Sequence, residues 1–237
     1  PNIRRVLAFS LLMGGVPGMV FFLLSQLAPE AVLGIYSEDP QVVALGAGYL
    51  RIFGWSFIMV VITFSYSAVL RSTGNVMGPL VVSTAALGLN VLLSYCLVFG
   101  KIGFPELGVN GAAYANLVAR ILECIAMLGL TYRFRLPAAV HLEDLLRLDW
   151  PFISKVLKPV LPVAFNELFW SLGITTYNVV YARIGTEAIA AMNIASTIDS
   201  LMFVFFIGIG NATAILVGNL IGAGEEHQAH QYAVRSL

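Results

Sequence analysis

Charged residues are scarce in this sequence. Only 11% of its 237 residues are Asp, Glu, Lys or Arg, and 59% are hydrophobic, whereas an ordinary soluble domain carries about 25% charged residues. Thirteen basic residues balance thirteen acidic ones, so there is no excess of basic charge for a phosphate backbone. These shortages disfavour a soluble enzyme, a nucleic-acid-binding protein and a disordered regulator. The composition indicates an integral membrane protein.

Motifs for catalysis and for metal or nucleotide binding are also missing. Cys96 and Cys124, the two cysteines, both lie inside apolar runs, so the sequence offers no disulfide framework. It contains no His-Glu-x-x-His motif, no Gly-x-Ser-x-Gly motif and no phosphate-binding loop. We therefore predict that the protein is not an enzyme, with no catalytic residue, no metal site and no cofactor. Any uphill work must then draw on an ion gradient.

Six apolar runs are each long enough to cross the hydrocarbon core of a bilayer, which takes roughly 20 helical residues. None of the runs alternates with the period of two that a barrel strand requires, so an all-α membrane protein is predicted. The predicted spans are Val6–Leu27, Ile52–Leu70, Pro79–Phe99, Ala112–Leu130, Val160–Val180 and Leu201–Ile221.

The basic residues gather on one side of these predicted spans. Nine of the thirteen lie in segments that share one side, three lie on the other, and Arg120 lies within a span. Cytoplasmic loops of membrane proteins are enriched in Lys and Arg. We therefore predict a multi-pass protein of the cell membrane, with both ends of this chain in the cytoplasm.

One long connection divides the spans into two groups. Within it, the leucines of Leu142–Leu146 and Trp150 recur at helical spacing, with acidic residues on the opposite face. Two interpretations stay open: a helix in the membrane interface, and a solvated linker helix packed on protein. The predicted parts are four spans in residues 1–132, a cytoplasmic connection in 133–158 and two spans in 159–237.

Ionisable side chains inside a span need an explanation, because a charge at mid-membrane costs at least about 2.5–3.5 kcal/mol. Glu167, beside Asn166 in the fifth span, either holds a proton or small cation during transport or links helices through hydrogen bonds. Arg120 and Glu123 lie three residues apart on one helix face, which predicts an internal structural ion pair. Asp199, near the outer end of the sixth span, either lines a cavity or lies at the interface.

Amide and aromatic side chains supply further candidates. An Asn in a membrane helix usually links helices through a hydrogen bond worth roughly 0.6 kcal/mol, but Asn90 and Asn116 are also candidates for cation or proton coupling. Aromatic and Met side chains can form a tolerant wall for flat cations, although lipid-facing packing explains them equally well. The candidates for such a substrate cavity are Phe169, Trp170, Tyr177 and Met202.

Five short sequence strings occur along the chain in an order that matches a known protein family. They are LRSTGN at 70–75, LGVNGAAYA at 107–115, PVAFNELFW at 162–170, IGTEA at 184–188 and ATAILVGNLIGAGE at 212–225. Together they resemble the MATE (multidrug and toxic compound extrusion) transporters, in a bacterial branch. Any one string is weak evidence for this family. Five strings in the same order, with compatible spacing over essentially the whole chain, are specific evidence for it.

The resemblance implies a fold of twelve helices in two six-helix lobes that face each other across a central cavity. The chain then looks like helices three to eight, a piece of a longer protein that is not expected to transport alone. Glu167 resembles the acidic residue of the family's seventh helix. Asn90 matches a family Asn, but Ser94 stands where several members carry Asp, and Asn116 stands at the place of a frequent Thr.

We therefore expect a secondary active transporter that exports drugs or organic cations in exchange for Na⁺ or H⁺. An ion bound at Glu167, Asn166, Asn90, Asn116 or Asp199 would bias the two lobes between outward- and inward-facing states. The expected partners are the lipid bilayer, a small organic cation and the remaining helices, with no nucleic acid. The alternative is a flippase for lipid-linked precursors, which needs a more cationic cavity than Arg120 alone provides.

Overall fold

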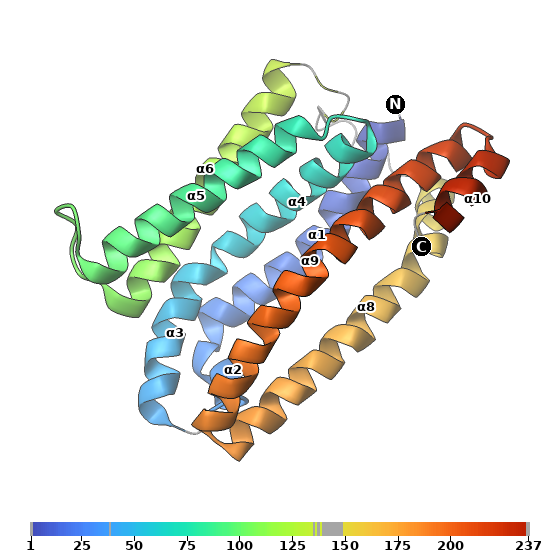
Figure 1. The fold of residues 1–237 in the computed structure, drawn as a ribbon. Helices are drawn as coiled ribbons and strands as arrows, with labels where there is room; N and C mark the ends of the chain where they lie inside the picture. The colour runs from blue at the N-terminus through green and yellow to red at the C-terminus, as the bar shows by residue number, and fades with distance from the viewer. Residues whose placement is uncertain (1, 38, 135, 137, 139–148, 236–237) are drawn as a thin grey trace. The chain divides into compact units, whose positions relative to one another are not determined.

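The computed structural model describes residues 2–37, 39–134, 136, 138 and 149–235. Within them the chain is helical and has no strand, as predicted for an all-α membrane protein (Figure 1). The structure divides into two compact units, Pro1–Thr175 and Thr176–Leu237. The helices are α1 (Asn2–Leu27), α2 (Pro29–Gly34), α3 (Pro40–Gly54), α4 (Ser56–Ser72), α5 (Met77–Phe99), α6 (Gly108–Arg133), α8 (Trp150–Ile184), α9 (Thr186–Gly222) and α10 (Glu226–Arg235).

Four of these helices, α1, α5, α6 and α9, are long and apolar enough to cross a membrane. Helices α3 and α4 pass the same test together, as a pair of helices bent by 45° at a short break. Five of the six predicted spans therefore correspond to helices of sufficient length and hydropathy. The sixth, Val160–Val180, lies inside the 35-residue helix α8, which is less apolar because Pro162, Asn166 and Glu167 interrupt its hydrophobic residues.

The predicted starts of two spans were wrong. The helical segment that contains Ile52 begins earlier, at Pro40, where the Asp39 carboxylate accepts a hydrogen bond from the Gln41 backbone N–H at 2.8 Å. An Asp at the N-cap and a Pro at the first helical position both favour a helix start. Similarly, α9 begins at Thr186, well before the predicted Leu201, because the small and polar residues between them form a helix without forming an apolar run.

The predicted cytoplasmic connection is described only at its ends. Residues 139–148, which include Leu142–Leu146, lie outside the described part of the chain, so both interpretations of this segment and the lobe boundary stay predictions. At the far end of the connection, the Arg5 guanidinium of α1 donates to the Asp149 carboxylate at 2.8 Å. The same guanidinium lies 4.6 Å from the ring centroid of Phe152. These two contacts link the start of α8 to α1.

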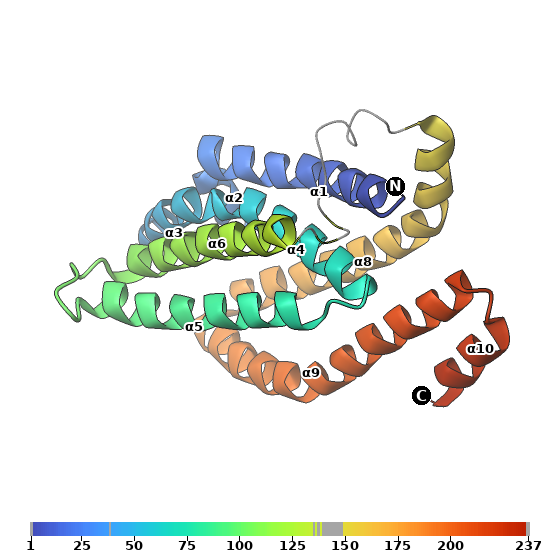
Figure 2. The ribbon, with the colours of Figure 1, turned by 90° about the horizontal axis from the view of Figure 1, so that it is seen from above.

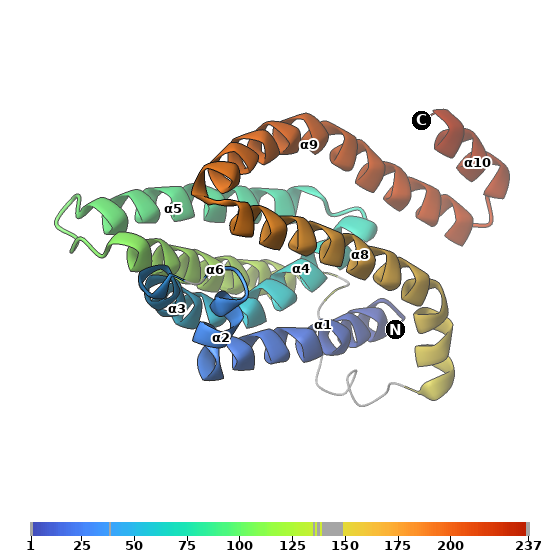
Figure 3. The same ribbon diagram turned by 90° about the horizontal axis from the view of Figure 1, so that it is seen from below.

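In the first unit, α4 packs against α1 and α6, and α5 packs mainly against α6. Figures 2 and 3 show α1 and α5 on opposite sides, with α4 and α6 between them. The apolar core lies where the first turns of α1 meet the last turns of α4 and α6. Its buried residues on these three helices are Leu7, Ala8, Tyr66, Val69, Leu70 and Met127.

The second unit contains the end of α8, all of α9 and the short helix α10. Helix α9 is strongly apolar, yet it buries none of its most apolar stretch within this chain. Helix α10 packs on α9 with Ala229 buried between them. An apolar helix surface of this size needs lipid or other helices around it.

Helices α5 and α6 form a hairpin whose two backbones come very close at Gly111. A Cβ atom placed on Gly111 would lie 2.6 Å from the carbonyl oxygen of Leu97 and 2.7 Å from its carbonyl carbon. Both atoms belong to the backbone, so neither can rotate away. Small residues allow this kind of approach between membrane helices, which gives Gly111 a packing role within the LGVNGAAYA string.

We expect Gly111→Ala to destabilise the protein, because α5 and α6 must separate to admit the methyl group. Overpacking of this kind costs typically about 1–3 kcal/mol. Thermal unfolding of the protein expressed from its complete gene, in detergent, measures the effect. Gly129→Ala on the same helix is the control, because a Cβ there meets nothing within 4 Å. The control should be neutral or stabilising by up to about 1 kcal/mol, and equal destabilisation by both changes would refute the close approach.

Candidate functional site

Helices α4, α5 and α6 enclose a cavity of about 440 Å³. This volume falls within the range of roughly 300–1,000 Å³ that is typical of small-molecule sites. The apolar part of its wall is formed by Val60, Phe64, Ala86, Leu87 and Ala119. The polar part is formed by Thr63, Ser67 and Arg71 of α4, Ser83 and Asn90 of α5, and Arg120 and Glu123 of α6.

The polar wall follows from helical periodicity. Thr63, Ser67 and Arg71 are four residues apart along α4, so their side chains lie on one face of that helix. Ser83 and Asn90 are seven residues apart on α5 and share a face for the same reason. Each of the three helices therefore turns a polar stripe toward the cavity.

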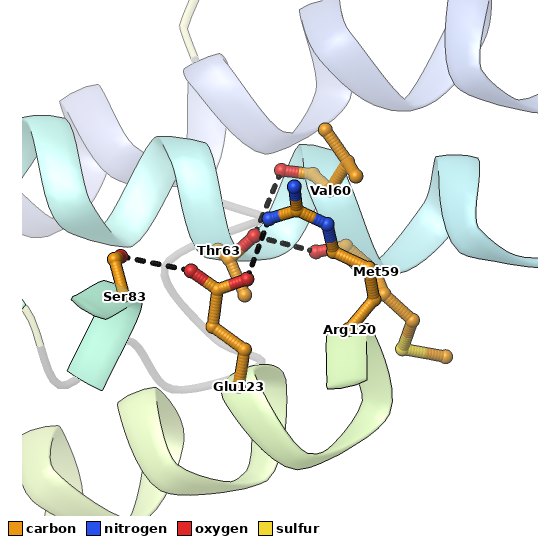
Figure 4. Close-up of polar contacts among 6 residues, drawn as sticks. All are labelled: Met59, Val60, Thr63, Ser83, Arg120 and Glu123. Atoms are coloured by element: carbon orange, nitrogen blue, oxygen red, sulfur yellow. Dashed lines mark hydrogen bonds and ion pairs between the residues drawn. The ribbon is translucent and has the colours of Figure 1, made fainter. Parts of the chain in front are cut away.

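Arg120 and Glu123 form an ion pair inside this cavity. The Arg120 Nη1 atom lies 2.6 Å from the Glu123 Oε2 atom, the contact that their spacing predicts. The other carboxylate oxygen, Oε1, accepts a hydrogen bond from the Ser83 hydroxyl of α5 at 2.8 Å, and Figure 4 shows both contacts. The Glu123 side chain is only 5% exposed, while that of Arg120 is 39% exposed. Glu123 is thus a buried carboxylate held by donors from two helices.

The neighbouring polar groups are partly satisfied by their own helices. The Thr63 hydroxyl donates to the carbonyl oxygens of Met59 and Val60 at 3.0 and 3.2 Å (Figure 4). The side-chain oxygen of Asn90 accepts a hydrogen bond from the Ser94 hydroxyl at 3.3 Å. Among the described residues, the amide N–H groups of Asn90 have no partner. Ser94 thus supplies a neutral hydroxyl at the place where the family resemblance led us to look for a carboxylate.

The charges of the cavity do not suit a bound metal cation. Oxygen atoms from Glu123, the hydroxyls and Asn90 are of the type that binds hard cations. However, Arg120 already neutralises the carboxylate, and Arg71 adds a second positive charge to the wall. In the described part of the chain, no group of three or more His, Cys, Asp or Glu side chains could hold a metal ion.

The structure places the remaining predicted site residues elsewhere. Asn116 lies on α6 but does not line the cavity, and its buried side-chain oxygen has no hydrogen-bond partner in the structure. The other predicted residues are exposed within this chain, so their roles in coupling and substrate binding stay predictions. They are Asn166, Glu167, Phe169, Trp170 and Tyr177 on α8, and Asp199 and Met202 on α9.

The sequence predicted Asn90 as a coupling candidate and Arg120 with Glu123 as a structural ion pair, and the structure places all three residues in one cavity. The prediction missed Thr63, Ser67 and Ser83 and treated Arg71 only as a basic flank of a span. The signal that was available is the recurrence of polar residues at four- and seven-residue intervals within otherwise apolar helices.

Apolar helices of membrane-spanning length and a polar cavity lined by α4, α5 and α6 define a polytopic membrane protein. The sequence profile of the MatE family matches residues 2–96 and 162–237, which is more than half of the chain. The chain belongs to the MatE family.

Individual relatives agree with this assignment. The chain is 31% identical over 199 residues to a probable multidrug resistance protein NorM of Rhizobium meliloti, covering 83% of this chain and 42% of the relative. A second NorM, from Thermotoga maritima, is 31% identical over 166 residues, which cover 68% of this chain and 35% of the relative. The chain therefore spans less than half the length of these curated relatives. They are named for drug resistance rather than for catalysis, in agreement with the prediction that the protein is not an enzyme.

Solved structures of MATE transporters share the fold. An outward-facing multidrug resistance MATE transporter superposes with a TM-score of 0.79 at 22% identity, over 98% of this chain and 51% of that structure. An inward-facing one gives a TM-score of 0.73 at 20% identity, over 98% of this chain and 53% of that structure. The predicted membership of a MATE-like fold is confirmed.

We expect Arg120→Gln to destabilise the protein, because it leaves the buried Glu123 carboxylate without its cation. The loss should be about 2–3 kcal/mol, below the roughly 3–5 kcal/mol of a fully buried pair, because Arg120 is 39% exposed. Denaturant unfolding of the protein in detergent measures it. The double variant Arg120→Gln/Glu123→Gln should recover most of the loss, since two neutral amides need no charge compensation. A double variant as unstable as the single one would show that charge pairing is not what holds this site.

Proposed function

We propose that the protein containing this chain is a secondary active exporter of drugs or organic cations that exchanges them for Na⁺ or H⁺. The observation that carries the proposal is the match of 98% of the chain to one fold in both an outward-facing and an inward-facing conformation. A protein with two such states transports against a gradient when ion and substrate each favour a different one. The relatives' names, which refer to multidrug resistance, support drugs as the substrates.

We place the coupling step at Glu167. It is the only acidic residue between Val160 and Val180, and it lies on α8 beside Asn166 with no hydrogen bond to the described residues. A carboxylate in an apolar segment either takes up a proton or seeks a cation. Both events change the charge of the site, and the resulting difference in affinity between the two states would couple the ion to the substrate.

The test is a transport assay with the protein from the complete gene reconstituted in liposomes. We expect an imposed Na⁺ or pH gradient to drive the movement of a fluorescent organic cation such as ethidium. Glu167→Gln should reduce this movement at least about tenfold, since the amide can neither release a proton nor supply a charged ligand. Glu226→Gln on α10 is the matched control and should leave transport unchanged.

Each alternative result has a defined meaning. Movement under neither gradient would remove the exporter proposal. Gradient-driven movement that persists in Glu167→Gln would support the exporter proposal but show that Glu167 is not the coupling residue.

We also propose that both ends of the chain face the cytoplasm, on the basis of the nine-to-three distribution of basic residues. The α5–α6 connection would then lie outside. In intact cells, a membrane-impermeant maleimide should label Lys101→Cys but should label Gln228→Cys only after permeabilisation. Both positions are exposed, and the native Cys96 and Cys124 are buried, so background labelling should be low. The reverse labelling pattern would invert the topology.

A flippase for lipid-linked precursors is the second candidate, favoured by one observation. Two arginines, Arg71 and Arg120, line the cavity, and a pyrophosphate head group would need such a cationic wall. In the liposome assay, a flippase would move no organic cation under either gradient.

A further inference from the structure

Helices α3 and α4 are separated by a break that the usual causes of a helix bend do not explain. The two helices are bent by 45°, and Trp55 alone lies between them. Trp55 keeps helical backbone angles, with φ at −62° and ψ at −26°. Sharp bends in helices most often occur at a proline, but the chain has no proline between Pro40 and Pro79. The bend therefore has another cause.

One backbone hydrogen bond is rearranged at this break. In a continuous α-helix, the Trp55 N–H would donate to the carbonyl of Arg51, four residues earlier. Here it donates to the carbonyl of Phe53 instead, and the Ser56 hydroxyl donates to the same carbonyl at 2.6 Å. The Arg51 carbonyl has thus lost its helical partner. An unpaired backbone carbonyl in a membrane span is costly, so this carbonyl needs a new donor.

A side chain from another helix supplies that donor. The Gln26 Nε2 atom, in the last turn of α1, donates to the Arg51 carbonyl oxygen at 2.8 Å. The Glu30 carboxylate of α2 accepts a hydrogen bond from the Arg51 guanidinium, also at 2.8 Å. Gln26 and Glu30 therefore hold the same residue at two points, its carbonyl group and its side chain.

Gly54 allows the end of α1 to approach the break this closely. A Cβ atom placed on Gly54 would overlap the Ser25 Oγ atom and lie 2.9 Å from the Gln26 Nε2 atom. Ser25 is only 1% exposed, and its hydroxyl donates to the Phe22 carbonyl at 2.6 Å, so it has no space into which to move. The lack of a side chain at Gly54 therefore lets Gln26 reach Arg51.

The Arg51 carbonyl has two competing donors. Gln26 is its partner in the bent span, whereas the Trp55 N–H would be its partner in a straight one. Exchange of the two donors keeps this carbonyl paired, and Trp55 is already helical, so the exchange needs little backbone rotation. We propose that the break is a joint with a bent and a straight form, and that Gln26 and Glu30 form a latch that holds it bent.

The joint precedes the part of α4 that lines the polar cavity. Thr63, Ser67 and Arg71 follow it on the same helix, so straightening would reorient this polar stripe relative to α3. The Glu30 and Arg51 side chains are 56% and 54% exposed, and a solvent-exposed ion pair is weak, so the latch can open and close repeatedly. The role of the joint in transport rests on the proposed export function. Its existence does not, because a distance measures it.

The test of the joint uses spin labels on Leu45→Cys of α3 and Ser72→Cys of α4, in the protein from the complete gene in nanodiscs. Both positions are exposed, whereas the native Cys96 and Cys124 are buried and should react little. At about 1.5 Å of rise per residue, straightening a 45° bend would lengthen the separation of the labelled positions by about 3 Å. Double electron–electron resonance resolves such a change.

We expect the unchanged protein to show mainly the shorter distance. Gln26→Leu removes the competing donor and should raise the ratio of straight to bent form by about threefold to tenfold. Glu30→Gln should raise it by about twofold to fivefold, and the double variant should make the longer distance prominent. Gln41→Leu on α3 is the matched control. Its exposed side chain forms no hydrogen bond with the described residues, so it should leave the distance unchanged.

The opposite change should lock the joint in its bent form. Trp55→Pro removes the N–H that competes for the Arg51 carbonyl, and the observed φ of −62° suits proline. This variant should show only the shorter distance and should move ethidium at least about tenfold more slowly under an ion gradient. Trp55→Phe keeps the N–H and is the control, which should retain transport.

Four results would overturn the inference in whole or in part. A single short distance in Gln26→Leu/Glu30→Gln would show that the bend needs no latch and is fixed. Lengthening by Gln41→Leu as large as that by Gln26→Leu would remove the specific role of Gln26. Transport retained by Trp55→Pro would exclude the joint from the transport cycle, and equal loss in Trp55→Phe would assign the effect to the indole ring.

The two kinds of measurement separate this inference from the export function. If the unchanged protein moves no ethidium, the export proposal fails, while the distances still decide whether the joint exists. The latch variants keep every backbone N–H, so the distance test does not depend on the folding of Trp55→Pro.

Discussion

A charged or polar side chain inside a bilayer has no water to solvate it, and the arrangement of α4, α5 and α6 depends on this constraint. Its polar groups either find a partner within the protein or face the cavity. Glu123 finds two, the guanidinium of Arg120 on its own helix and the hydroxyl of Ser83 on α5. The Thr63 hydroxyl donates hydrogen bonds to backbone carbonyl groups of its own helix. The cavity is therefore polar because three helices direct their least apolar faces toward one another.

The same constraint separates residues that stabilise the fold from residues available for function. A carboxylate held by two donors, such as Glu123, contributes to the folded structure and is poorly suited to exchange ions. A cation with no side-chain partner among the described residues, such as Arg71, or an acid on an exposed helix, such as Glu167, retains its capacity to bind. Glu167 is therefore the residue to which we assign the proposed coupling to the ion.

Much of this fold could be predicted from the sequence, because membrane helices are encoded locally. The ends of α1 and α5 lie close to the predicted ones, since each predicted span is a mainly apolar run without a charged residue. The start of α3 was missed because its first turns are less apolar than a span, although Asp39 and Pro40 carried a helix-start signal. The Arg120–Glu123 pair was predictable because three-residue spacing is a property of one helix. The contacts of Ser83 and the position of Arg71 in the cavity were not, because helical spacing defines a face but not which helix lies opposite it.

The α5–α6 hairpin is joined at two distant places, by the backbone approach of Gly111 to Leu97 near the connection and by the Ser83–Glu123 hydrogen bond nearer the other end. Two attachments along one pair of helices resist both sliding and splaying. In the alternating access proposed above, the hairpin would move as one rigid unit. The cavity would then change shape where the hairpin meets α4. The guanidinium of Arg71, which belongs to α4, would then move relative to the hairpin, so the motion that opens the cavity would also separate Arg71 from Arg120.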